Sequence, residues 1–92
     1  ANQLIEKRLA ACVNIIKDVH SIYWWEGKIV KDKEELLVIK SRYELYPELE
    51  NEIRALHPYT IPEILILPVT GGNKEYLQWV MEETKSGFDE NP

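Results

Sequence analysis

Two separate parts of the chain carry side chains that could hold a metal or line a binding cleft. Residues 54–64, RALHPYTIPEI, bring His57, Tyr59 and Glu63 close together around two prolines. Imidazole ligates Cu(II) or Zn(II) when unprotonated, which is its main form near neutral pH. The other part contains Cys12, whose thiolate would favour Cu(I). These four side chains are the candidates for a metal contact or for contacts to a ligand.

A structural role competes with each candidate. Tightly bound metals usually have three or four protein ligands, and the sequence contains no HxH, HxxxH or CxxC spacing. His57 can instead cap the end of a helix that Pro58 terminates. Tyr59 can pack while Glu63 begins a strand, and a free cysteine such as Cys12 is often a small buried hydrophobe. The sequence leaves both interpretations open, and a symmetric oligomer could supply missing ligands.

Catalysis has no support in the sequence. The loop TGGN at 70–73 lacks the lysine and the length of a phosphate-binding P-loop. Cys12 with the remote His57 is the one nucleophile–base pair that can be named, and no spacing brings the two together. We therefore expect a protein that is not an enzyme.

Length and charge limit the class of protein. The 92 residues predict one domain over 1–85 with a polar tail over 86–92. Sixteen acidic against eleven basic residues give a net charge of −5. This balance argues against duplex nucleic acid and against an anionic membrane surface. The acidic runs at 32–35 and 48–52 are typical of solvated faces, with diffuse attraction of cations as the alternative.

Cysteine content and hydropathy indicate a compartment. A single cysteine forms no internal disulfide, which favours a reducing environment. No apolar run has the length of a membrane span, and no signal-peptide segment is recognisable. We expect a cytoplasmic protein.

The first half of the chain predicts a helix followed by a long hairpin. Leu4, Ile5 and Leu9 share one helical face. ACVNII then predicts a strand, and residues 19–41 form two β-rich runs around Gly27, typical of an antiparallel hairpin. Neighbouring residues in a strand point to opposite faces, so Trp24 and Trp25 both need cover, one of them against another subunit.

The second half predicts helix, strand and helix. Leu45, Leu49, Ile53 and Leu56 give a helical spacing, with Pro47 tolerated in the first turn. EILILPV, residues 63–69, predicts a strand. Asn73 is placed to cap a closing helix in which Tyr76, Leu77, Val80 and Met81 lie along one side. One strand in front of this order would give the β-α-β-β-α-β arrangement, so we expect an α+β ferredoxin-like sandwich, an antiparallel sheet with helices on one face.

Four segments in this order resemble the CutA divalent-cation tolerance proteins. They are EKRLAACVNII, SIYWWEGKI, LHPYTIPEILILPV and YLQWV, and together they cover the chain from Ile5 to Glu83. Single segments are weak signals, but HPYTIPE together with YWWEGKI is specific. The sequence is identified as a member of this family.

The resemblance implies a function and an assembly. It implies a ferredoxin-like homotrimer in which the long hairpin pairs between subunits, and a role in tolerance of copper and other divalent metals, with Cu(II) or another cation weakly bound. Trp24, Trp25 and Trp79 could stack on bases, but the acidic charge balance opposes this, and we expect them to pack in the core and at the trimer interface. The alternative is a trimeric sensor or scaffold similar to the PII signalling proteins, with a small molecule or partner protein bound at subunit clefts. The turn near Gly27 is shorter than the partner-binding loop of PII proteins.

The sequence departs from the family pattern in two respects. No strand precedes the first helix, and that strand would lie in the middle of the sheet, so we expect neighbouring backbone edges to be exposed. The proposed copper ligands of a bacterial member are a cysteine on that strand and two adjacent histidines. Leu56 stands at the first histidine, and only His57 matches.

Overall fold

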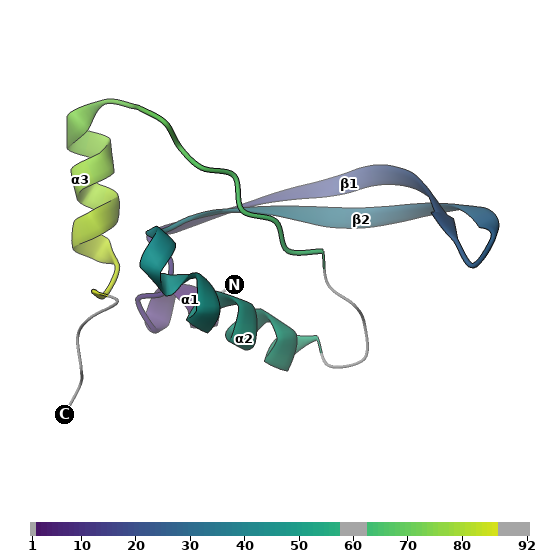
Figure 1. The fold of residues 1–92 in the computed structure, drawn as a ribbon, viewed down its shortest axis with the longest axis horizontal. Helices are drawn as coiled ribbons and strands as arrows, with labels where there is room; N and C mark the ends of the chain where they lie inside the picture. Colours follow the sequence, from purple (N-terminus) through teal and green to yellow (C-terminus); the bar gives the residue numbers. More distant parts are fainter. Residues whose placement is uncertain (1, 58–62, 87–92) are drawn as a thin grey trace.

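A long β-hairpin projects from a small helical base (Figure 1). The structure is a computed structural model that describes residues 2–57 and 63–86. The antiparallel pairing and the helices agree with the predicted α+β class. The elements, in chain order, are α1 Asn2–Glu6, β1 Cys12–Trp25, β2 Lys28–Lys40, the 3₁₀ turn η1 Tyr43–Leu45, α2 Tyr46–Leu56 and α3 Lys74–Glu83.

The hairpin turn is the short one that the sequence predicts. Trp25 pairs with Lys28, so only Glu26 and Gly27 lie in the turn. Their φ angles are +51° and +78°. Two left-handed residues in succession are the signature of a type I′ turn, whose twist matches that of the flanking strands. The strands stay paired down to Cys12 and Lys40, which confirms the predicted hairpin.

A bulge in β1 changes which residues share a face. Ile16 pairs with Leu36 and Val19 with Glu34, so Lys17 and Asp18 together oppose the single Glu35. Asp18 has a φ of +60°. This left-handed backbone conformation accommodates the extra residue of the bulge. Even-numbered residues of β1 before the bulge therefore share a face with odd-numbered residues after it.

The hairpin accordingly has two different faces. On the base side, Val13 and Ile39 pack against the core cluster. We call the opposite one the open face. By register and strand alternation it carries Cys12, Asn14, Ile16, Val19, Ser21, Tyr23 and Trp25 from β1 and Lys28, Val30, Asp32, Glu34, Leu36, Val38 and Lys40 from β2.

The core lies where the base meets the hairpin. Its buried members are Leu4, Leu9, Ala10, Leu45 and Leu49. The prediction for Ile5 was wrong, because its side chain is 40% exposed. α1 ends at Glu6, and the chain turns back through Arg8 at φ +59°, so that the N–H groups of Leu9 and Ala10 donate to the carbonyl of Leu4. Leu9 thus reaches the core through a turn rather than along a helical face.

α2 agrees with its predicted spacing except at its end. Pro47 occupies the first turn, Leu49 is buried, and Ile53 packs against the core. Leu56 is exposed, since the last turn extends beyond the core. Pro58, expected to end the helix, lies outside the described residues.

The predicted strand over 63–69 is not present as a strand. Residues 63–69 have no regular secondary structure and no described residue is paired with them as a strand, and a strand exists only through hydrogen bonds to a neighbour. Leu65, Leu67 and Val69 are 74–84% exposed as a result.

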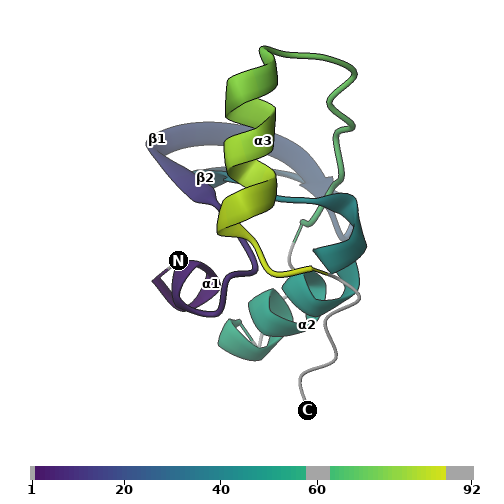
Figure 2. The same cartoon turned by 90° about the vertical axis from the view of Figure 1, so that its left-hand side faces the viewer.

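α3 stands beside the base of the hairpin (Figure 2) and is attached through its C-terminal end. The Arg42 guanidinium donates to Oγ1 and the carbonyl of Thr84, at 3.0 and 3.2 Å, and to the carbonyl of Met81. Of the predicted apolar side, Val80 is buried, whereas Tyr76, Leu77 and Met81 are partly exposed. Asn73 holds the N-cap position, but its side chain makes no capping bond, contrary to our expectation.

Candidate functional site

His57 directly follows the last turn of α2 and is exposed. Its backbone N–H donates to the carbonyls of Ile53 and Arg54, both at 3.2 Å. The main chain rather than the imidazole therefore closes the helix. Within the described residues the ring has no hydrogen-bond partner.

The other candidates do not join His57. Glu63 is exposed, and Tyr59 lies outside the described residues. Cys12 is half-buried at the start of β1, where its thiol lies 3.9 Å from Oδ1 of Asn14. Figure 1 shows the start of β1 and the end of α2 apart from one another. The 2–57 and 63–86 ranges contain no group of three or more metal-ligating side chains.

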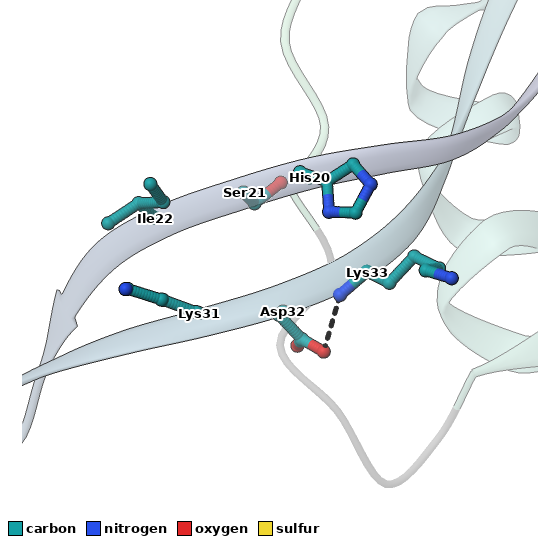
Figure 3. Close-up of a pocket in the computed structure, with 6 residues that line it drawn as sticks. All are labelled: His20, Ser21, Ile22, Lys31, Asp32 and Lys33. Carbon is teal, nitrogen blue, oxygen red and sulfur yellow. Dashed lines mark hydrogen bonds between the residues drawn. The ribbon is translucent and has the colours of Figure 1, made fainter.

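A shallow hollow of about 320 Å³ lies along the hairpin (Figure 3). His20 pairs across the strands with Lys33, and Ile22 pairs with Lys31. The backbone N–H of Lys33 donates to the Asp32 carboxylate at 2.9 Å. Two lysine ammonium groups beside the single histidine disfavour a bound cation through like-charge repulsion. The hollow is therefore a poor metal site.

The open face carries a row of polar groups that sequence reasoning missed. The Ser21 hydroxyl donates to Glu34 at 2.7 Å, and the Tyr23 hydroxyl donates to Asp32 at 3.3 Å. Desolvation, and then the neighbouring Asp32 carboxylate, raise the pKa of Tyr23 above 10.0. Residues 32–35 are all exposed, in agreement with the solvated face that the sequence predicts. The available signal was the alternation of the hairpin, which places Asp32 and Glu34 on the same side.

The three tryptophans lie in two regions. Trp24 and Trp25 flank the hairpin turn on opposite faces and are 71% and 51% exposed. Trp79 is partly exposed on α3, with its ring centroid 5.5 Å from that of Tyr76. Single chains rarely leave large aromatic rings this exposed, and aromatic residues are enriched where proteins meet.

Comparison with known sequences gives consistent matches. A sequence model described as CutA1 divalent ion tolerance protein matches residues 1–83. The chain is 51% identical over 84 residues to the divalent-cation tolerance protein CutA of Thermus thermophilus and spans 82% of its length. It is 49% identical over 89 residues to human protein CutA. The chain spans about half the length of the human protein and of the chloroplastic CutA proteins of rice and Arabidopsis.

Solved structures agree with the sequence matches. The divalent cation tolerance protein from Thermus thermophilus superposes with a TM-score of 0.88 at 50% identity, covering 92% of this chain and 82% of that one. CutA1 from Oryza sativa gives a TM-score of 0.87 at 46% identity, covering 91% and 77%.

Proposed function

Because the chain belongs to the CutA1 divalent ion tolerance protein family, we propose that it is a trimeric, divalent-cation-binding protein of metal tolerance. The observation that carries the proposal is the match over residues 1–83, with 51% identity to a protein named for divalent-cation tolerance. The relatives are named as tolerance proteins and not as enzymes, so we assign binding rather than catalysis.

Self-association is supported by the hairpin. Its open face exposes Ile16, Leu36 and Val38 together with Trp25. Apolar surface of this kind gains free energy when a second copy removes it from water. Among the described residues the sheet contains β1 and β2 alone, so the outer edges of the hairpin present backbone groups that can pair with another chain. The copies form a closed trimer in this proposal.

The metal contact is assigned to His57. His57 is exposed at the end of a helix that its backbone N–H closes, and its imidazole has no hydrogen-bond partner within the described residues. A lone histidine binds Cu(II) or another divalent cation weakly, so the remaining ligands come from a neighbouring copy or from Tyr59 and Glu63. We place the protein in the cytoplasm because of its single unpaired cysteine. No described helix could span a membrane.

Native mass spectrometry with added Cu(II) tests the proposal. The wild-type chain is expected to appear as a trimer that takes up three copper ions. His57→Ala should keep the trimer and lose the copper, whereas His20→Ala, which removes the other histidine, should keep both. Copper uptake that is unchanged in His57→Ala, or lost in His20→Ala, would refute the assignment. A chain that remains monomeric would refute the trimer.

A further inference from the structure

The hollow along the hairpin repels a cation, and for the same reason its charge suits an anion. His20, Lys31 and Lys33 lie on the face of the distal hairpin opposite to the open face, because successive residues of a strand alternate between its faces. All three residues are exposed. An ammonium group can donate three hydrogen bonds, and a neutral imidazole donates one. The hollow therefore offers local positive charge and several donors on a chain whose net charge is −5.

The acidic neighbours of the hollow leave this positive charge largely uncompensated. The Asp32 carboxylate accepts hydrogen bonds from the Tyr23 hydroxyl on the open face and from the backbone N–H of Lys33, at 3.3 and 2.9 Å. Asp18 lies 3.9 Å from the Lys33 ammonium, and the two side chains are 76% and 63% exposed, so this ion pair is weak. Among the described residues, Lys31 takes part in no ion pair.

The two lysines extend to opposite sides of the hollow. Lys31 and Lys33 are two residues apart on β2, about 7 Å at the usual rise of a strand. Figure 3 shows their side chains pointing away from one another along the strand, as expected for like charges. Glu35, the next residue of this face, lies at the bulge on the far side of Lys33 from Lys31. An anion between the lysines offsets their repulsion, and the flexible lysine stems allow both ammonium groups to turn toward it.

We propose that this hollow binds a small polyphosphate anion whose oxygens accept hydrogen bonds from Lys31, Lys33 and His20. Charge-assisted hydrogen bonds to phosphate are about twice as strong as neutral ones, and a chain of phosphates can meet both lysines at once. The volume of about 320 Å³ lies at the lower end of the range for small-molecule sites. The site uses neither His57 nor the open face, so it goes beyond the metal contact and the self-association proposed above.

Isothermal titration calorimetry with sodium tripolyphosphate, in the absence of divalent cations, tests the site. The wild-type chain should bind the anion saturably. Lys31→Gln with Lys33→Gln removes both ammonium groups and should weaken binding by about tenfold or more. Lys28→Gln with Lys74→Gln removes the same charge from the open face and from the start of α3, and should stay within about threefold of wild type. Circular dichroism of every variant reports whether the chain is folded.

Asp18→Asn separates the effect of charge from that of structure. Asparagine tolerates the left-handed conformation of this position, where φ is +60°. The substitution removes the negative charge that faces the Lys33 ammonium. The variant should therefore bind tripolyphosphate about two- to threefold more tightly, the size of effect expected for an exposed ion pair.

Amide chemical shifts measured by NMR during the same titration locate the anion, and the largest changes should fall at residues 20–22 and 31–33. No saturable binding, equal weakening in the two lysine variants, or weaker binding by Asp18→Asn would overturn the site. His57→Ala should bind tripolyphosphate as wild type does. Failure of the metal assignment at His57 and failure of the anion site are therefore distinguishable.

Discussion

The helical base and the distal hairpin differ in how far their side chains are buried and hydrogen-bonded. In the base, Leu45 is fully buried, and no buried side-chain polar atom in the described residues lacks a hydrogen-bond partner. At the hairpin tip Trp24 is 71% exposed. The base is stabilised by contacts within one chain, whereas the distal hairpin has regular strands whose large side chains are not covered by the rest of the chain. A region can therefore have regular secondary structure while its large apolar side chains remain exposed.

The largest effect is expected in the base. Leu45→Ala leaves a cavity beside Leu4 and Leu49, and such truncations cost about 2–5 kcal/mol of unfolding free energy. Denaturant unfolding at a fixed protein concentration measures the loss. Leu56→Ala, on the exposed last turn of α2, serves as the control and should cost about 1 kcal/mol or less. Equal losses in the two variants would contradict the position of the core.

The next effect distinguishes the two faces of the hairpin. Trp25→Ala removes the aromatic ring from the open face and should weaken self-association by about 2 kcal/mol per contact, roughly 30-fold in dissociation constant. Trp24→Ala removes a ring of the same size from the other face and should have the smaller effect. Light scattering over a dilution series compares them, and a larger loss for Trp24→Ala would reverse our assignment of the faces.

A smaller effect is expected where α3 joins the base. Arg42→Ala removes donors to the Thr84 side chain and to two carbonyl groups, and Thr84 is buried. Leaving such groups unsatisfied should cost about 1–3 kcal/mol. Hydrogen exchange should show the loss of protection centred on 74–84. Arg54→Ala, which removes an exposed pair with Glu50, is the control. If Arg42→Ala proves as mild as Arg54→Ala, the attachment of α3 lies elsewhere.

A substitution in the hairpin turn should have a small effect on stability. Gly27 has a φ of +78°, and a methyl group added there meets nothing within 4 Å. Gly27→Ala therefore introduces backbone strain without a clash, at a cost of about 1 kcal/mol. Thermal unfolding measures it, with Gly71→Ala as the control because that position has open space and no positive φ. A large loss of stability would mean that the turn is tightly packed.

The smallest expected effect is on the stability of the fold at low pH. Hydrogen bonds from Arg54 and then Tyr46 hold the pKa of Glu50 below its ordinary value of 4.5. A lowered carboxylate pKa stabilises the fold above the ordinary value, and that stabilisation is lost as pH falls through the lowered pKa. Glu50→Gln should therefore be slightly less stable than wild type at pH 7 and equal to it in strong acid. A difference that persists at low pH would assign the effect to packing.

The sequence was sufficient for elements defined by local chemistry. Two β-rich runs around Gly27 predicted the hairpin, and the spacing of Leu45, Leu49 and Ile53 predicted α2. The bulge at Lys17 and Asp18 has no comparable signal, because it depends on how two distant strands pair. Since the bulge decides which residues share a face, the polar row on the open face could not be located in advance.

The prediction of a strand over 63–69 was wrong for a related reason. Its composition is that of a strand, but hydrogen bonding requires a partner at the correct distance, and local sequence does not supply one. The candidate site was similarly limited. Sequence could name His57 as an imidazole after a helix, but whether other ligands reach it depends on contacts between distant segments or between copies.

Amide hydrogen exchange at a series of protein concentrations tests the contrast between base and hairpin most directly. Our account predicts that protection in the distal halves of β1 and β2 falls as dilution dissociates the trimer. Protection of the Leu45–Leu49 region should change much less, because its contacts lie within one chain. Distal protection that is independent of concentration, or that falls equally in both regions, would contradict the claim that the hairpin is completed by another copy.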